Sequence, residues 1–259
     1  MNLFKRLTLM LLLATGTNYS WTSIQTISKL REVLNYLNPG KRSLVIFDID
    51  NTLLTTKTDL GSDHWLCDHL KRGYSFPELS ELYFHINNRM DLVPTEPDLI
   101  ETIQEIEQNC DHVICLTARS GNIIDQTLLQ LKRNNLNFHV PEINYDDLVL
   151  PDQSHYHDGV LFCCNHSKGD ILNLFLTATH YQPEQIILID DKLYNLDAVL
   201  KTVPASINFT GLHYTGINYK INQFDPQQTQ GELLEFIAQH PFDGFVPTIS
   251  PLNEVNPKD

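Results

Sequence analysis

Short apolar runs alternate along the chain with longer amphipathic stretches, and this alternation is the main signal of the fold. Runs rich in β-branched residues are typical of strands buried on both faces of a parallel sheet. We predict strands at 44–47, 113–117, 159–163, 186–189 and 205–209. Apolar residues at helical spacing predict helices at 23–37, 77–90, 97–108, 168–179, 193–203 and 230–240, with one more ending at Arg133. Strands that alternate with helices indicate an α/β fold with a doubly wound, Rossmann-like parallel sheet.

Some stretches depart from this alternation. The chain between the first two strands, at about 56–93, is too long for a turn and must have a structure of its own. Its polar beginning, 55–61, is predicted to form a loop or hairpin, and the Asn-, Asp- and Pro-rich stretch 136–157 is predicted to be irregular. The tail 241–259 is rich in Pro and Asn, and we predict that it is loosely ordered.

Acidic side chains directly follow the first predicted strand. Asp48 and Asp50 are two residues apart, so both can face one pocket at the carboxyl end of the sheet. Two adjacent carboxylates repel each other, and a bound cation or a shared proton would offset that repulsion. Considered alone, the pair could equally be ordinary polar residues at the end of a strand.

Three later positions carry candidate chemistry in chain order. Thr117 ends the second strand, Lys168 opens the helix after the third, and Asp190 with Asp191 ends the fourth. Each alone has an ordinary explanation, namely a helix cap for Thr117 or the paired acids and a solvated lysine for Lys168. Their occurrence together and in this order argues against a purely structural explanation of the whole set.

Together these motifs resemble the four signatures of the haloacid dehalogenase-like (HAD) superfamily, the first of which matches Asp48-x-Asp50-x-Thr52. The resemblance implies a HAD-like core over 23–240, with the insert at about 56–93 forming a small helical cap. It also implies phosphoryl transfer through an aspartyl-phosphate. Asp48 would be the nucleophile, and Asp50 would act first as the general acid and then as the general base.

The resemblance also gives roles to two other residues and indicates the reaction type. Thr117 would hold a phosphoryl oxygen, and Lys168 would supply positive charge to the nucleophile and the phosphoryl group. Family members that cleave carbon–halogen bonds lack the second acid, because no leaving oxygen needs a proton. Asp50 therefore favours phosphate ester hydrolysis, although a phosphomutase would keep the same acid.

A magnesium ion completes the implied site, because this hard cation prefers oxygen ligands and needs few carboxylates. Asp48 and the carbonyl of Asp50 would bind it together with one acid of the Asp190–Asp191 pair. Asp191 is favoured as the direct ligand with Asp190 behind it, although the two could exchange roles. Asn195 could reach the same ion through a water molecule.

Four further residues are candidates for substrate contacts. Thr52 ends the first signature, and Arg119 follows Thr117 closely enough to meet an anionic substrate, although pairing with a local acid is equally plausible. Asp63 and His64 follow the predicted loop or hairpin and could touch the substrate, with surface packing as the alternative.

The N-terminus has the pattern of a secretory signal peptide over residues 1–22. Lys5 and Arg6 precede an apolar run that is too short for a normal membrane span, and small and polar residues follow. Cleavage is predicted between 16 and 23, and an uncleaved anchor is the alternative. This signal, together with the motifs at 60–65, 116–120 and 189–196, resembles a little-characterised family of exported HAD-like proteins from Gram-negative bacteria. We therefore predict a periplasmic or secreted protein without stable membrane insertion after cleavage.

Net charge narrows the range of partners. The formal charge of −14 disfavours nucleic acid and anionic lipid. The motifs, the resemblance and the net charge together lead to one hypothesis, that the protein is a magnesium-dependent phosphoric monoester hydrolase that acts on a small phosphorylated substrate. The alternative is a non-catalytic binding protein or secreted effector that keeps the fold and the metal pocket, and the sequence leaves the oligomeric state open.

Cysteine and histidine patterns add little chemistry. The 5 cysteines lack the Cys-x-x-Cys spacing of a metal site and are predicted to be mostly free and buried. The stretch His155-x-His157-Asp158 resembles a zinc site in composition only, and we predict a polar loop there.

Overall fold

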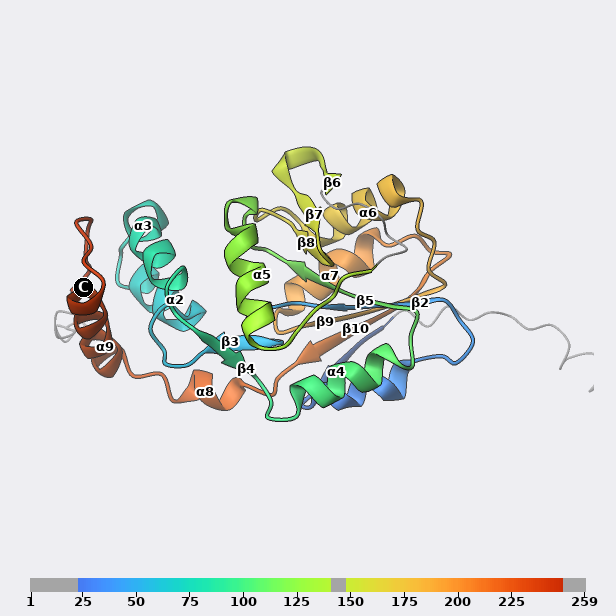
Figure 1. Cartoon of the computed structure of the whole chain (residues 1–259), viewed down its shortest axis with the longest axis horizontal. Helices are drawn as coiled ribbons and strands as arrows, with labels where there is room; N and C mark the ends of the chain where they lie inside the picture. The colour runs from blue at the N-terminus through green and yellow to red at the C-terminus, as the bar shows by residue number, and fades with distance from the viewer. Residues whose placement is uncertain (1–22, 141–147, 249–259) are drawn as a thin grey trace, which may run out of the picture.

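The computed structural model describes residues 23–140 and 148–248, and its centre is an eight-stranded sheet with the strand order β1-β10-β9-β2-β5-β8-β7-β6 (Figure 1). The strands from β1 to β8 in this order run parallel, and β7 and β6 extend the sheet in antiparallel pairing. The strand bounds are β1 (Ser23–Ile27), β2 (Ser43–Phe47), β5 (His112–Thr117), β6 (Leu148–Val149), β7 (His155–His157), β8 (Val160–Phe162), β9 (Gln185–Asp190) and β10 (Asn208–Tyr214).

Helices cover both faces of this sheet, which confirms the predicted doubly wound α/β fold. Val45 and Phe47 of β2 join one apolar core, and Leu44 and Ile46 join the other, because side chains alternate along a strand. Figure 1 shows α4 on one side of the sheet and α6 on the other. The first core is covered by η1 (Leu30–Tyr36), α4 (Leu99–Glu107) and α5 (Ile124–Arg133), and the second by α6 (Lys168–Thr179) and α7 (Leu193–Thr202).

The helix predicted over 23–37 is wrong in its first part. Residues 23–27 form the edge strand β1, which pairs in parallel with β10, and the 3-10 helix η1 begins only at Leu30. Ile24 and Ile27 have the spacing of one helix face, but in the strand they enter opposite cores. The local pattern of residues 23–27 suits both a helix and a strand, and pairing with the distant strand β10 makes this segment a strand.

Two other boundaries also differ from the sequence prediction. The last strand, predicted at 205–209, is β10 and lies further along the chain, at Asn208–Tyr214. The stretch 136–157, predicted to be irregular, contributes the short strands β6 and β7 in its described part. These strands are too short to show a clear period-two pattern, so their pairing with β8 could not be predicted from periodicity.

The insert after β2 has a fold of its own. Strand β3 (Leu54–Thr56) pairs antiparallel with β4 (Leu92–Pro94), so the insert leaves and re-enters the core through one two-stranded stem. Between these strands lie α2 (Asp63–Lys71) and α3 (Phe76–Asn87). The Ser62 hydroxyl caps α2 by accepting a hydrogen bond from Trp65 N, which fixes where that helix begins. The insert is thus a small helical cap, as predicted.

A second segment, from the C-terminal end of the chain, completes this cap. Helix α9 (Pro226–Gln239) lies beside α2 and α3 at one end of the molecule, and its Leu233 is fully buried (Figure 1). Leu233 packs in a small apolar cluster with Trp65 and Leu82 of the insert. The short helix α8 (Asn218–Asn222) precedes α9, and its Lys220 donates to the Thr56 carbonyl of β3.

The tail beyond α9 differs from the prediction of loose order as far as it is described. Phe242 and Val246 pack against the cluster formed by the insert and α9, and the Tyr74 hydroxyl donates to the carbonyl of Thr248. Their apolar side chains dock this part of the tail on the insert. The rest of the predicted tail and the predicted signal peptide lie outside the described residues. Among the helices of the described chain, none is long and apolar enough to cross a membrane.

Candidate active site

The end of β2 and its turn position the first two acids. The backbone N–H of Asp48 donates to the Ile189 carbonyl over 2.9 Å, so the β2–β9 pairing extends to Asp48 itself. Asn51 adopts a left-handed conformation with φ of 61°, which lets the chain turn sharply into β3. Asp48 and Asp50 therefore lie at the carboxyl end of the sheet, as predicted.

Lys168 joins the first and fourth signatures. Its Nζ lies 2.6 Å from Oδ1 of Asp48 and 2.7 Å from Oδ2 of Asp190, and only 1% of its side chain is exposed. Lys168 begins α6, so the helix start delivers the ammonium group to the strand ends of β2 and β9. Two acids and one lysine, far apart in sequence, form one buried ion cluster.

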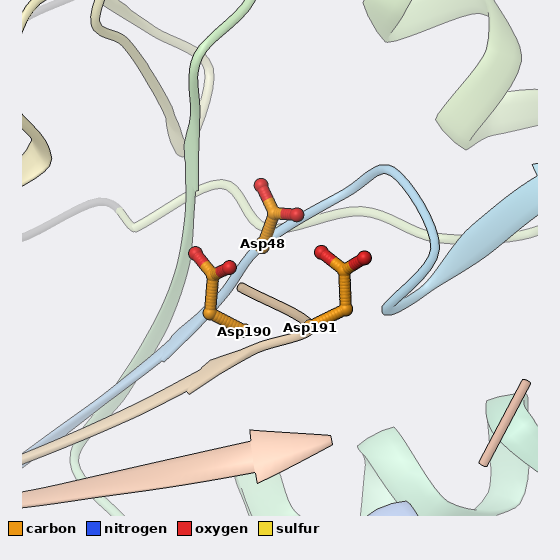
Figure 2. Close-up of side chains that lie close together, drawn as sticks. All are labelled: Asp48, Asp190 and Asp191. Carbon is orange, nitrogen blue, oxygen red and sulfur yellow. The ribbon is translucent and has the colours of Figure 1, made fainter. Parts of the chain in front are cut away.

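Three carboxylates converge beside this lysine. Asp48, Asp190 and Asp191 can each offer an oxygen within 4.8 Å of the others, and Figure 2 shows the three groups around a common space. Burial raises the pKa of Asp48 well above its usual range against the attraction of Lys168, and the charges of Asp190 and Asp191 add to this effect. Burial also raises the pKa of Asp191 to about 6, although Lys192 opposes the shift. Such a set of crowded oxygen donors fits a hard divalent cation.

The two neighbouring acids differ in how many of their hydrogen-bonding positions are taken. Asp190 is fully buried and accepts hydrogen bonds from Lys168, from the Lys192 backbone N–H at 2.8 Å and from Asn195 Nδ2 at 3.0 Å. Asp191 lines the pocket and is paired with Lys192 Nζ at 2.9 Å. Asn195, predicted to reach the metal through a water, thus holds Asp190 directly.

Arg119 clamps the second acid of the first signature. Its Nε and Nη2 donate to the two oxygens of Asp50 over 2.8 and 2.7 Å, which is a bidentate pair. Its Nη1 donates to Thr127 Oγ1 at 3.0 Å and Gln130 Oε1 at 2.8 Å, both on α5. Burial alone would raise the pKa of Asp50, but the charge and hydrogen bonds of Arg119 outweigh it and lower that pKa. Of the two roles considered for Arg119, the structure shows the pairing with an acid.

Thr117 lies just behind the pocket wall. It ends β5, is 1% exposed, and its hydroxyl accepts a hydrogen bond from the Arg119 backbone N–H at 3.3 Å. The next residues, Ala118, Arg119 and Ser120, line the pocket. Thr117 therefore orders the loop that carries the pocket wall.

The pocket is a cavity of about 280 Å³ with walls from both the core and the cap. Asp48, Asp50 and Lys168 lie on the core side. The cap side is formed by Asp63, Leu66, Phe76, Tyr83, Phe84, Asn87 and Asn88. The acids and the lysine thus open towards a space that α2 and α3 close from the other side.

Lys192 connects the two walls. Its Nζ pairs with Asp191 of the core at 2.9 Å and with Asp63 of α2 at 3.2 Å. Asp63 also accepts a hydrogen bond from Asn51 Nδ2 at 3.2 Å, so the predicted contact residue at the start of the cap lies in the pocket. Sequence reasoning missed Lys192, although its position directly after Asp191 was a usable signal.

Two predicted substrate contacts lie outside the pocket. Thr52 is fully buried beneath the turn, where its carbonyl accepts a hydrogen bond from Thr95 Oγ1 at 2.6 Å. The His64 ring turns towards Phe224, with 6.4 Å between the ring centroids, and burial lowers its pKa. The structure thus gives Thr52 a packing role and places His64 against the segment that leads into α9.

The remaining candidate ligands form no second site in the described chain. All 5 cysteines are free, but only Cys115 and Cys163 are buried. His155 and His157 lie in β7, and Asp158 pairs with His139 Nδ1 at 2.9 Å. Among the residues described, the carboxylate group at the strand ends is the one cluster with metal-ligand geometry.

Comparison with known proteins gives a family and several distant relatives. A family described as "Protein of unknown function (DUF2608)" matches residues 24–235. A Chlamydia pneumoniae protein named "Putative outer membrane protein" is 27% identical, and the match covers 70% of this chain and 71% of that protein. A Chlamydia trachomatis protein of the same name is 26% identical over 82% of this chain and 84% of its own.

Similar solved structures include members of the superfamily that the sequence motifs resemble. A haloacid dehalogenase-like hydrolase from Streptococcus pneumoniae has a TM-score of 0.42 at 13% identity, covering 69% of this chain and 97% of its own. A HAD-superfamily hydrolase from Ehrlichia chaffeensis has a TM-score of 0.42 at 12% identity, covering 77% of this chain and 100% of its own. A class C acid phosphatase from Bacillus anthracis has a TM-score of 0.35 at 15% identity, covering 93% of this chain and 87% of its own.

Proposed function

The chain belongs to the DUF2608 family of proteins of unknown function, and we propose that it is a magnesium-dependent phosphatase that hydrolyses monoesters of small molecules. The observation that carries this proposal is the buried contact of Lys168 with Asp48 and Asp190 beside Asp50 at the pocket floor. A carboxylate attacks an anionic phosphate only where positive charge offsets the repulsion. Lys168 supplies such charge at the oxygen of the nucleophile.

The first half of the reaction transfers the phosphoryl group to Asp48. Lys168 holds Oδ1 of this residue, which leaves Oδ2 to attack phosphorus as the bond to the leaving oxygen breaks. The leaving oxygen takes its proton from Asp50. Because Arg119 lowers the pKa of Asp50, this acid is a poor proton donor at neutral pH, so esters with weakly basic leaving oxygens are favoured.

The second half of the reaction uses Asp50 as a base. A water molecule gives its proton to the Asp50 carboxylate and attacks phosphorus, which releases inorganic phosphate and frees the Asp48 carboxylate. Donation of its proton in the first half leaves Asp50 as the carboxylate that this role needs, and its lowered pKa favours that ionised form. Arg119 keeps both Asp50 oxygens directed by its two hydrogen bonds.

The carboxylate cluster is the proposed magnesium site. Asp48 and Asp191, with the Asp50 carbonyl, would hold the ion, which would add Lewis-acid charge at the phosphoryl oxygens. We favour Asp191 over Asp190 as the direct ligand, because Lys168, Asn195 and a backbone N–H already occupy the Asp190 oxygens. Asp190 would then orient Lys168 from behind.

Export is part of the proposal. Lys5 and Arg6, with the apolar run after them, support a cleaved signal peptide. Cleavage between 16 and 23 would leave the whole described fold, which starts with β1 at Ser23, in the mature protein. Relatives named as outer membrane proteins agree with a location outside the cytoplasm.

The test is hydrolysis of p-nitrophenyl phosphate by the protein lacking residues 1–22, with and without magnesium. Asp48→Asn removes the nucleophile and should reduce kcat/KM by at least about a thousandfold. Asp98→Asn is the matched control, because Asp98 is about half exposed and lies on the core surface, where its nearest cation is Arg31 at 3.9 Å. Magnesium-dependent release that Asp98→Asn keeps and Asp48→Asn loses supports the proposal. Absence of release from folded protein would favour a binding protein.

A further inference from the structure

Most of the cap wall of the pocket is apolar and aromatic, with Asp63, Asn87 and Asn88 as its polar members. Phe76 and Phe84 of α3 line the pocket with 43% and 39% of their surfaces exposed, and Leu66 of α2 and Tyr83 of α3 lie beside them. Large apolar side chains that remain exposed next to a reaction centre indicate a surface that a ligand covers.

Packing from behind holds these rings in place. Phe76 and Phe84 meet edge to face with centroids 6.5 Å apart, and Tyr83 and Phe84 meet in a similar way at 5.9 Å. Tyr83 stacks on the buried Trp65 at 6.4 Å. The wall is therefore a preformed set of rings and loses little entropy when another ring packs on it.

The positive charges that line the pocket are already paired. Lys168 contacts two acids, Arg119 holds Asp50 with a bidentate pair, and Lys192 lies between Asp191 and Asp63. Beyond the reaction centre and Asp63, the polar lining side chains of the described chain are uncharged amides and hydroxyls, which include Asn87, Asn88, Gln126, Asn165, Ser120 and Tyr194. A second anionic group on a substrate would meet no free cation there and would lose its hydration without compensation.

We propose that the pocket selects phosphate monoesters whose leaving group is a single uncharged aromatic or heteroaromatic ring, seated against Phe76, Tyr83 and Phe84. This inference rests on the proposed phosphatase function and names its substrate class. A cavity of about 280 Å³ suits a phosphoryl group with one small ring. The amides at its rim can donate to or accept from ring substituents without requiring charge.

Two substrate pairs test the ring and the charge separately, with the mature protein and magnesium. Benzyl and cyclohexylmethyl phosphate share a primary alcohol as leaving group and have similar size, so their ratio of kcat/KM reports the aromatic face. We expect benzyl phosphate to be favoured about 3- to 10-fold, the range of a good aromatic contact. 4-Carbamoylphenyl phosphate should be favoured about tenfold or more over 4-carboxyphenyl phosphate, which adds a charge to the same ring.

A protein variant assigns any preference to the cap wall. Phe76→Leu keeps an apolar side chain at the start of α3 but removes the ring, and should bring the benzyl to cyclohexylmethyl ratio close to one. Phe245→Leu is the matched control, because Phe245 is a similarly exposed phenylalanine of the tail, and it packs on Tyr74 outside the pocket. That control should keep the ratio.

Binding of non-hydrolysable phosphonates separates this inference from the proposed function. Benzylphosphonate and cyclohexylmethylphosphonate would be titrated calorimetrically in the presence of magnesium. Turnover without ring or charge preference would overturn the inference and leave the phosphatase intact. Selective binding of benzylphosphonate without turnover of any ester would remove the phosphatase and keep the ring site. Absence of both binding and turnover would remove both.

Discussion

The two walls of the pocket are built on opposite principles. The core wall is a set of paired charges at the ends of β2 and β9, with Lys168 buried between two carboxylates. Apart from Asp63, the cap wall is uncharged and is dominated by aromatic rings on α3, which contacts with α2 and α9 hold in place. The core wall depends on sheet register, whereas the cap wall depends on the packing of an inserted segment against the end of the chain.

Because of this difference, the core wall can hold the reacting groups while the cap wall selects the substrate. Strand ends in one hydrogen-bonded sheet fix the distances between reacting groups, because shifting one strand would break its whole ladder. The cap touches the core wall through few polar links, such as Lys192 to Asp63 and Gln130 Nε2 to the Asn87 carbonyl at 3.2 Å. Side chains on α3 can therefore change without altering the positions of the acids.

Removing the buried cation of the core wall should have the largest effect on stability and turnover. Lys168→Met would leave Asp48 and Asp190 buried without their shared cation, which costs about 3–5 kcal/mol in comparable buried pairs. We expect this loss in the free energy of urea unfolding at pH 7, together with loss of turnover.

The control for Lys168→Met is the same substitution at Lys192, whose side chain is 30% exposed between Asp63 and Asp191. Solvent screens the contact with Asp63, which is 35% exposed, and the buried Asp191 can take up a proton, so Lys192→Met should cost less than Lys168→Met, about 1–2 kcal/mol. Equal losses for the two variants would contradict the distinction between a buried charge cluster and a partly exposed bridge.

Removing a buried side chain that supports the cap wall should have the next largest effect on stability. Leu233→Ala removes a fully buried side chain from the cluster that joins α9 to the insert, and should cost about 2–4 kcal/mol. Leu234→Ala, at a site 59% exposed on the same helix, should change stability by less than about 0.5 kcal/mol.

Tryptophan fluorescence can localise the effect of Leu233→Ala. The sequence contains 2 tryptophans, and a protein that lacks residues 1–22 retains only Trp65, inside the cap. We expect the Trp65 signal to unfold at lower urea than the circular dichroism of the whole protein. Coincident transitions would show that core and cap unfold as one cooperative unit.

The core wall could be predicted from sequence because its signals are local. Each functional residue follows or precedes a strongly apolar run, and parallel strands bring such ends together at one edge. That rule placed Asp48, Asp190 and Asp191 at one edge of the sheet, whereas Lys168, which begins α6, was added by the resemblance to the HAD signatures. The edge strand β1 was missed, because its partner β10 lies far away in sequence and the local pattern also suited a helix.

The cap wall could be predicted only as an insert that contains a helix at 77–90, which is α3. Its length showed that it must be structured, but the docking of α9 depends on contacts such as Leu233 with Trp65, which no local period shows. The sequence left two roles open for Arg119, contact with an anionic substrate or pairing with an acid, and only its distance to Asp50 in three dimensions shows the pairing. Thr52 and His64 do not line the pocket: Thr52 is buried in the turn after Asp50, and His64 follows Asp63 in α2 but packs near Phe224, the alternative considered for it.

Replacing Arg119, which connects Asp50 with α5, should have a moderate effect on kcat/KM. Arg119→Lys keeps the charge but loses the bidentate fork, so Asp50 would be less well oriented. We expect roughly a 10-fold fall in kcat/KM for alkyl phosphates, whose leaving oxygen needs a proton, because the lost orientation of Asp50 outweighs any rise in its pKa when the Arg119 hydrogen bonds are lost. The fall should be much smaller for p-nitrophenyl phosphate. An equal fall for both substrates would indicate a general structural defect.

The smallest expected effect is a pH dependence confined to the cap. His69 is buried beside Trp65, its Nδ1 lies 2.8 Å from the Trp65 carbonyl, and its Nε2 has no hydrogen-bond partner. Burial lowers the pKa of His69 although the Trp65 carbonyl opposes the shift, so the unfolded cap takes up the proton first as pH falls. Cap stability should therefore decrease below about pH 6.5, by at most about 1.4 kcal/mol per pH unit for one proton.

Urea unfolding followed by Trp65 fluorescence at pH 7.0 and 5.5 measures this dependence. His69→Gln keeps a donor for the Trp65 carbonyl and removes the titration, so the acid-induced shift should shrink. His64, also in the cap and with a pKa lowered mainly by burial, should account for a remaining part. An unchanged shift in the double variant His64→Gln, His69→Gln would rule out both histidines as its cause, and Asp191 could not replace them, because an acid whose pKa is raised by burial stabilises the folded state as pH falls.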